Sequence, residues 1–240
     1  MRKIAVVHGL YRYPVKSMAG ETLNEIELGW HGLEGDRRFA FVRTNELVGM
    51  PWLTASRLPE LLLYEPHYAN DDIAKISVLV KTPDGLEMEL SDTRLAERIS
   101  QLYGSDVYLM QLDSGIFDQA PLSLISLETI AAMGDETSRK LEIARFRPNI
   151  VVELLDGPAF AEDTWVGHRL TFGTSLDAPA MRATERDIRC VMVNIDPTTL
   201  KKDASVLKTI AKQHETCLGI YGSVERRGRI QVGDIISLED

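Results

Sequence analysis

The sequence predicts a mainly β protein with added helices, in the α+β class, built as a barrel or a sandwich. Short runs rich in β-branched and aromatic residues recur along the whole chain of 240 residues. Only a few stretches show helical periodicity, and strands do not alternate regularly with helices as a parallel α/β fold requires. A loop-like stretch begins at Asp113, so we expect an N-terminal β-rich domain at 1–112 and a second domain at 113–240.

The N-terminal half is read mostly as strands. The alternation of apolar and polar side chains is clearest at 22–28, as expected for a half-buried strand. Pro83, Asp84 and Gly85 form a hairpin turn, because proline fixes φ and glycine tolerates a positive φ. The strands expected in this half lie at 4–15, 22–28, 37–43, 61–68 and 75–91.

Helical patterns begin at 91–104. Ser91 or Asp92 can cap this helix, and Gly104 can end it. Further helices are expected at 127–133, 138–144 and 205–214.

The C-terminal half returns to strands. The apolar run at 149–154 predicts a buried strand, and the end of the chain at 220–239 predicts two strands joined at Arg227 and Gly228. Two more strands are expected at 168–178 and 185–196.

Composition narrows the possible functions. The formal net charge of -9 disfavours nucleic-acid binding, because such a surface repels a phosphate backbone. No apolar run is long enough for a membrane span, and the N-terminus lacks a signal-peptide pattern. The two cysteines, Cys190 and Cys217, do not form a disulfide framework, so we expect a cytoplasmic protein with reduced thiols.

Common catalytic and nucleotide-binding motifs are missing from the sequence, including GxGxxG, the P-loop, HExxH and CxxC. Three basic clusters remain, at 13–17, 35–38 and 145–149. Lysine and arginine with neighbouring hydroxyl or amide groups suit a phosphate or another oxyanion. For each cluster by itself, solvated charges beside a turn are the simpler interpretation, since surface arginine and lysine are common.

Cys190 follows Arg189 directly. A thiol near cations would have a lowered pKa and could act as a soft thiolate ligand or carry sulfur. The alternative is an inert cysteine buried on an apolar strand. Cys217 lacks charged neighbours of this kind and is interpreted as structural.

Six motifs resemble the MOSC superfamily in order over nearly the whole chain. They are YPVKS, GDRRF, FRPNIVV, FAEDTW, RCVMVNIDPTT and IQVGDIISL. This resemblance implies a MOSC-type β-barrel preceded by a β-rich N-terminal domain. It also implies a bound molybdenum cofactor of the molybdopterin type.

The resemblance implies roles for particular residues. The cysteine of the RC motif, Cys190, would be the molybdenum ligand and belong to the catalytic centre. Asp196 would orient a metal-bound water, although a turn residue before Pro197 is the simpler interpretation. The implied cofactor-binding residues are Lys16, Ser17, Arg37, Ser126, Arg147 and Asn149.

Two functions are consistent with this resemblance. The first is a molybdenum-dependent oxidoreductase that reduces small N-hydroxylated or N-oxide substrates with electrons from a separate redox protein. The second is a carrier of sulfur or cofactor that uses a Cys190 persulfide or thiolate and depends on a sulfur donor. The sequence contains no motif of a fused redox domain or of a pyridoxal-phosphate domain, so we expect electrons or sulfur to come from a partner. Nucleic acids and membranes are not expected as partners.

Overall fold

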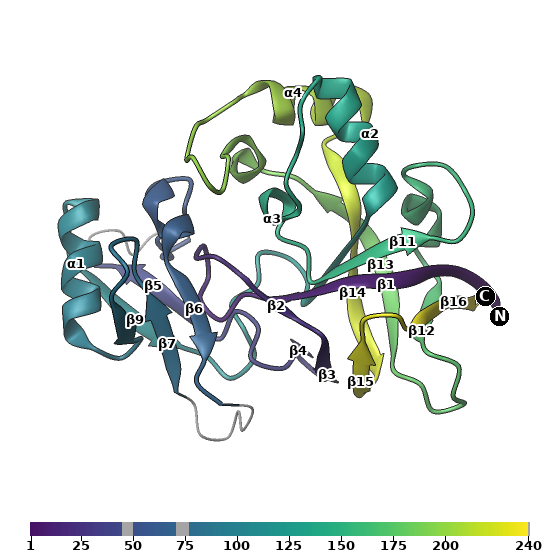
Figure 1. The fold of residues 1–240 in the computed structure, drawn as a ribbon, viewed down its shortest axis with the longest axis horizontal. Helices are drawn as coiled ribbons and strands as arrows, with labels where there is room; N and C mark the ends of the chain where they lie inside the picture. The colour runs from purple at the N-terminus through teal and green to yellow at the C-terminus, as the bar shows by residue number, and fades with distance from the viewer. Residues whose placement is uncertain (45–49, 71–76, 240) are drawn as a thin grey trace.

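The computed structural model describes residues 1–44, 50–70 and 77–239 and shows two lobes (Figure 1). The larger lobe is a β-barrel with helices on one side, and the smaller lobe contains the first helix and several short strands. The expected strand at 75–91 begins at two residues, Lys75 and Ile76, that lie outside the described ranges.

Seven strands close into the barrel, because β11 pairs with β10 on one side and with β1 on the other. All pairs are antiparallel except β10 with β11. This architecture confirms the predicted β-rich α+β class. In order around the barrel, the strands are β11 (Ile150–Leu154), β10 (Leu122–Ser126), β14 (Cys217–Arg226), β13 (Ala180–Ile188), β12 (Arg169–Phe172), β16 (Ile235–Glu239) and β1 (Arg2–Arg12).

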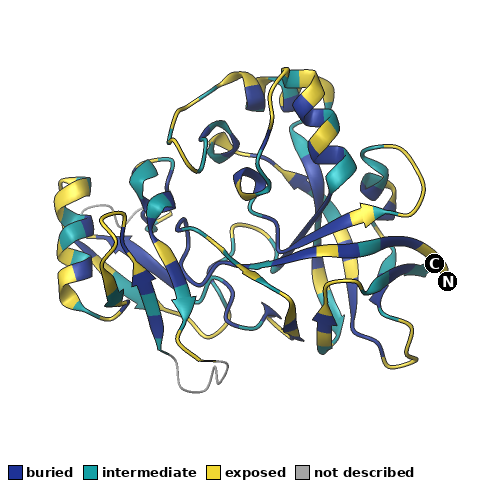
Figure 2. Ribbon diagram, viewed as in Figure 1, coloured by how far each residue is buried: buried dark blue, intermediate teal, exposed yellow. Residues whose placement is uncertain are grey.

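Alternation of side chains fills the barrel interior. In β1, Ala5 and Val7 are buried in its core, and Leu10 joins them after a bulge between Val7 and Gly9. Most barrel strands in Figure 2 are coloured as buried along much of their length. A short edge strand, β2 (Glu21–Leu23), pairs with the end of β1 in antiparallel orientation. A small sheet packs beside the barrel. That sheet contains β3 (Glu25–Gly29), β4 (Gly32–Leu33) and β15 (Gly228–Gln231).

Three helices cover one side of the barrel with their own apolar cluster. α2 (Leu127–Thr137) starts directly after β10, and α3 (Ile143–Phe146) precedes β11. α4 (Ser205–Gln213) contributes the fully buried Val206 and Ile210 to the same cluster. Packing of an amphipathic face therefore stabilises these short helices.

The smaller lobe has a separate core beneath α1 (Thr93–Tyr103). The Asp92 carboxylate accepts from the Arg94 backbone N–H at 2.9 Å, and Gly104 ends the helix at a φ of 79°. Both ends therefore agree with the sequence prediction. The other elements are β5 (Phe39–Arg43), β9 (Val107–Gln111), the 3₁₀ helix η1 (Pro59–Leu63), β6 (Glu65–Tyr68), β7 (Val78–Lys81) and β8 (Glu87–Glu89).

Several expected elements differ from the structure. The strand expected at 185–196 ends at Ile188 and is followed by a 3₁₀ helix, η3 (Val191–Asn194). The helix expected at 138–144 is displaced to α3, because Ser138 adopts the left-handed conformation that ends α2. The segment 220–239 forms parts of three strands rather than two, since Gly233 provides a further turn.

The two lobes share the chain's N-terminal segment. β1 lies in the barrel, whereas β5 belongs to the smaller lobe, and the chain returns to the barrel at β10. The boundary between 1–112 and 113–240 stays a prediction.

Candidate functional site

A cavity of about 380 Å³ brings together six of the residues that the sequence singled out. They come from three distant parts of the chain, and both lobes contribute lining residues. The six are Lys16, Ser17, Arg37, Arg147, Asn149 and Cys190. This volume lies at the small end of the range of ligand-binding clefts.

The backbone joins the first two basic clusters. The amide of Arg37 donates to the carbonyl of Tyr13 at 2.7 Å, and the amide of Lys16 donates to the carbonyl of Phe39 at 2.8 Å. The buried Asp36 carboxylate accepts from the amide of Tyr13 at 2.7 Å and also pairs with the Arg37 guanidinium. These bonds hold residues 13–17 and 36–39 side by side, with their cations on the cavity wall.

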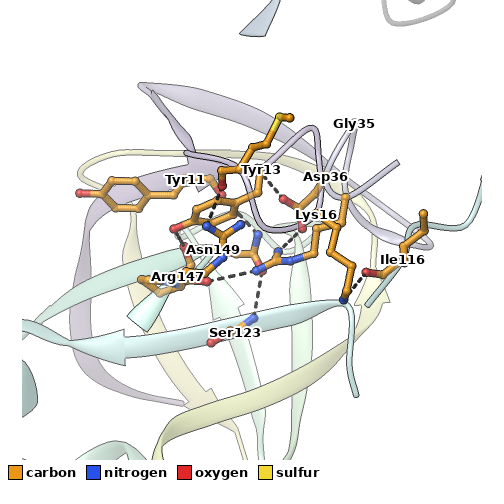
Figure 3. A network of polar contacts seen from close by, with 12 residues as sticks. Tyr11, Tyr13, Lys16, Gly35, Asp36, Ile116, Ser123, Arg147 and Asn149 are labelled. Atoms are coloured by element: carbon orange, nitrogen blue, oxygen red, sulfur yellow. Dashed lines mark hydrogen bonds and ion pairs between the residues drawn. The ribbon is translucent and has the colours of Figure 1, made fainter. Parts of the chain in front are cut away.

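Tyr13 lies between two guanidinium groups. Its ring centroid is 4.3 Å from the Cζ atom of Arg147 and 4.8 Å from that of Arg37. The ring is 1% exposed, and its hydroxyl donates to the Pro148 carbonyl at 3.1 Å (Figure 3). An aromatic face attracts cations, so Tyr13 holds both side chains in place. The sequence alone did not indicate this role for the tyrosine.

Asn149 connects the third cluster to the barrel. Its side-chain Nδ2 donates to the Tyr11 carbonyl at 3.3 Å, and its Oδ1 accepts from the Ser123 amide at 3.2 Å (Figure 3). Oδ1 also accepts from the Arg37 guanidinium at 3.3 Å. Asn149 is 1% exposed, so its main role in this arrangement is to position Arg37 and the adjoining strands.

Lys16 reaches across to the loop that leads into β10. Its Nζ donates to the Ile116 carbonyl at 3.1 Å and pairs with Asp118 at 2.6 Å. The lysine side chain is buried, whereas the Asp118 carboxylate is 63% exposed. An ion pair with an exposed partner is weak, so an anionic ligand can compete with Asp118 for this ammonium.

The cations of the cavity repel one another. Burial lowers the pKa of Arg147 to about 10, and the neighbouring Arg37 adds to this effect. Burial also lowers the pKa of Lys16, although Asp118 opposes the shift. For Arg37, burial lowers the pKa, but Asp36, Tyr13 and Asp118 together more than offset it, so the pKa is raised. A bound anion would relieve this repulsion.

Among the described residues, the guanidinium group of Arg147 has one terminal nitrogen with a partner and one without. Arg147 Nη1 donates to the Met18 carbonyl at 2.7 Å. Within residues 1–44, 50–70 and 77–239, no hydrogen-bond partner meets its buried Nη2. An unmet buried donor is costly, which makes this side chain receptive to a ligand oxygen.

Three of the lining residues have strained backbones. Ser17, Arg37 and Arg147 have φ values of 67°, 50° and 51°. The left-handed region costs roughly 1–3 kcal/mol for a residue with a side chain, and such strain concentrates at functional sites. At Arg147 the cause is local: it ends α3, and Pro148 cannot continue the helix.

Cys190 is exposed at the cavity, in contrast to the alternative of a buried inert thiol. Its backbone is extended, with a φ of -111° and a ψ of -178°. Successive side chains of an extended chain point to opposite sides, so Arg189 is buried where Cys190 is exposed. The Arg189 guanidinium donates to the Leu218 carbonyl at 2.8 Å and the Phe146 carbonyl at 2.7 Å. The neighbouring arginine is therefore bound by backbone carbonyls of other elements, although it directly precedes Cys190 in the sequence.

Asp187 is a buried carboxylate that the sequence analysis missed. It lines the cavity, lies 3.0 Å from the Arg189 guanidinium and accepts from the Ser123 hydroxyl at 2.8 Å. Burial raises its pKa, while Arg189 opposes the shift. The Tyr221 hydroxyl also bonds to it, and burial raises the pKa of that tyrosine as well. Asp187 lies near the end of β13, and its position two residues before Arg189, just beyond that strand, is the signal that could have paired them.

Ser126 lies elsewhere. It is fully buried and caps α2, with its hydroxyl accepting from the Thr129 amide at 3.0 Å. The same hydroxyl donates to the buried Glu162 at 3.1 Å, and burial raises the pKa of that carboxyl. The structure thus gives Ser126 a structural role and does not bring it to the cavity, contrary to its assignment as a cofactor-binding residue.

Asp196 also has a structural role, because its carboxylate stabilises a turn. Its Oδ1 accepts from the amides of Thr198 and Thr199, at 3.0 and 2.7 Å, and its Oδ2 lies 3.4 Å from Arg145. The backbone bond from Thr199 is the main cause of its lowered pKa. This is the turn-residue interpretation, and the carboxylate is not placed to orient a ligand in the cavity.

Two further features concern the part of the chain that the structure describes. No group of three or more His, Cys, Asp or Glu side chains is arranged there to hold a metal ion. No helix in those residues has the length and apolar character needed to cross a membrane.

Two family models match the chain. The model described as the MOSC domain matches residues 104–237, and the one described as the MOSC N-terminal beta barrel domain matches residues 4–114. A solved structure, the YUAD protein from Bacillus subtilis, aligns over 99% of this chain and 97% of its own, with a TM-score of 0.55 and 15% identity. That level of identity supports the fold alone.

Named proteins from other organisms are similar in sequence to this chain. Mitochondrial amidoxime reducing component 2 of Macaca fascicularis is 26% identical over 98% of this chain and 83% of its own length. The human protein of the same name is 24% identical, again over 98% of this chain and 83% of its own length. Molybdenum cofactor sulfurase of Caenorhabditis briggsae is 22% identical over 97% of this chain but only 35% of its own length.

Proposed function

The chain belongs to the MOSC domain family, and on this premise we propose that it binds the molybdenum cofactor and acts as an oxidoreductase. The proposed reaction is the reduction of a small N-hydroxylated or N-oxide substrate with electrons from a separate redox protein. One observation carries the proposal: an exposed thiol and three cations converge on one cavity from distant parts of the chain. The names of the similar amidoxime reducing components support the choice of substrate.

The residues present fit such a cofactor. A molybdopterin carries a phosphate, and Lys16, Arg37 and Arg147 offer charge-assisted donors for it. The unpaired Nη2 of Arg147 and the mutual repulsion of the cations both favour an anion at this place. Cys190 would supply a soft thiolate ligand to the metal. When bound, the cofactor supplies two-electron oxygen-transfer chemistry.

The chain's own residues would bind and orient the cofactor. Tyr13 contacts the guanidinium groups of both Arg37 and Arg147 through its ring, which would help to fix where a phosphate can lie. Asn149 holds Arg37 from the barrel side. Asp187 lines the cavity and holds the Ser123 hydroxyl and the Arg189 guanidinium in place beside it.

Metal and activity measurements test this proposal together. Protein loaded with cofactor should contain about one molybdenum atom per chain and reduce benzamidoxime with an artificial electron donor. Cys190→Ser should lose the metal and the activity, whereas Cys217→Ser, the matched change at the half-buried cysteine, should keep both. A fully loaded protein without turnover would exclude the proposed reaction.

A carrier of sulfur or cofactor is the second candidate, and the exposure of Cys190 favours it because a partner could reach this thiol. In this case Cys190 would carry a persulfide received from a separate sulfur donor. Mass spectrometry of protein incubated with a cysteine desulfurase should show one added sulfur at Cys190. Absence of this sulfur, together with failure to transfer bound cofactor to an acceptor apoenzyme, would exclude the carrier function.

A further inference from the structure

Large apolar side chains are exposed where the cavity opens beside Cys190. Ile188, Val191 and Met50 line the cavity and are 55%, 54% and 51% exposed. We call these three residues the apolar rim. Cys190 lies between Ile188 and Val191 in the chain and is itself exposed. Exposed apolar surface of this kind, rimmed by polar residues, marks a binding site.

Other lining residues of the cavity are polar and buried. Lys16, Ser17 and Asn149 are polar and are 5%, 6% and 1% exposed. The cavity therefore has a cationic wall of buried polar groups and an apolar rim beside the thiol. A ligand that satisfies the cations would leave the apolar rim as the contact surface for a second molecule.

We propose that the apolar rim is a subsite for the uncharged, apolar body of the substrate, such as an alkyl chain or an aryl ring. The assignment of this body to a reducible N-hydroxylated compound rests on the proposed function. The subsite itself rests on the exposure of Met50, Ile188 and Val191 around the Cys190 thiol. Half-buried Phe117 and Met192 continue the same apolar lining into the cavity.

The size of the surface favours a small molecule over a protein partner. A stable protein interface needs roughly 800 Å² from each partner and some 20 residues on each side. The apolar rim contains three residues and belongs to a concave cavity of about 380 Å³. Concave, mostly apolar surface with a few polar groups is typical of small-molecule sites.

Alkylation of the thiol tests the subsite without cofactor or turnover. A homologous series of N-alkylmaleimides from methyl to hexyl would be reacted with the cofactor-free protein, and labelling of each cysteine would be followed by mass spectrometry. The rate at Cys190 should rise by about threefold to fourfold for each added methylene until the rim is covered. Cys217 in the same molecule and a small free thiol should show no such increase.

Variants separate the rim from general surface polarity. The pair Ile188→Asn and Val191→Asn should flatten the chain-length dependence at Cys190. Leu176→Asn changes an apolar residue that is 91% exposed and does not line the cavity, so it should preserve the dependence. A wild-type rate at Cys190 that is independent of chain length, or a dependence that survives the rim variants, would overturn the proposal.

Turnover of alkyl amidoximes then distinguishes the two proposals. If loaded protein reduces amidoximes and kcat/KM rises with chain length, both hold. Equal kcat/KM for short and long chains would overturn the subsite while the proposed function stands. If alkylation of the cofactor-free protein depends on chain length but the loaded protein reduces no amidoxime, the proposed function is overturned while the apolar subsite stands.

Discussion

Replacing Arg147 by alanine should weaken anion binding much more than it weakens the fold. In the ligand-free protein this side chain gains a cation–π contact with Tyr13 at 4.3 Å and one hydrogen bond to the Met18 carbonyl at 2.7 Å. At a buried ring the first contact contributes about 1–2 kcal/mol, and the hydrogen bond contributes about 1.5–3 kcal/mol. Two features oppose them: the unmet Nη2, which costs about 1–3 kcal/mol, and the burial that lowers the pKa of this arginine to about 10. The opposing contributions should leave the free energy of unfolding within about 2 kcal/mol of the wild type.

In the ligand-bound state, Arg147→Ala loses a charge-assisted hydrogen bond to the ligand, and no opposing cost is removed with it. One such bond to a phosphate oxygen contributes about 1.5–3 kcal/mol, so the dissociation constant should rise by about 10- to 150-fold. Titration calorimetry with molybdopterin would measure the affinity, and urea denaturation would measure the stability. Arg229→Ala is the matched control, because this arginine is 60% exposed and forms ion pairs on β15 with Glu25 and Glu27. An affinity within threefold of the wild type, or a loss of stability above about 3 kcal/mol, would refute the reasoning.

Three further changes test neighbouring parts of the structure. Ser126→Ala should lower the free energy of unfolding in urea by about 1–2 kcal/mol through loss of the α2 cap, and an equal loss of anion affinity would contradict its structural role. Tyr13→Phe should retain the affinity measured by calorimetry, whereas Tyr13→Leu should weaken it because the stacking surface between the guanidinium groups is lost; equal affinities would contradict that role. Burial raises the pKa of Asp187, so its contribution to stability is present below the unfolded pKa of about 4 and is lost as pH rises through the folded value. The free energy of unfolding would be measured for both proteins from about pH 4 upward. Asp187→Asn should become more stable relative to the wild type as pH rises, and a difference that does not change with pH would contradict the raised pKa.

The fold class and most of the site were accessible from local patterns. Alternation and turn chemistry predicted part of the barrel, including most of β1 and β11, but β10 was not expected and only the end of β13 was. Capping residues predicted both ends of α1 at Asp92 and Gly104. The basic motifs indicated Lys16, Arg37 and Arg147 as candidates beside strand ends, and the resemblance to the MOSC superfamily assigned them to an anionic ligand. These features depend on residues within a few positions of one another.

Tertiary contacts decided the rest. Arg189 precedes Cys190 in the sequence, yet the extended backbone turns the two side chains to opposite sides, and the guanidinium binds carbonyls from other elements. Ser126 resembles a ligand-binding serine until its burial against Glu162 is known. Tyr13 becomes important only because two guanidinium groups from distant segments meet on its ring.

The sequence alone therefore determined which residues carry charge, which turn the chain and which strands alternate, because these are local properties of composition and spacing. Only the three-dimensional structure decided which of those residues share a cavity. Burial, side-chain direction and electrostatic repulsion between Arg37 and Arg147 depend on long-range pairing of strands, such as β1 with β11, and no short segment specifies it.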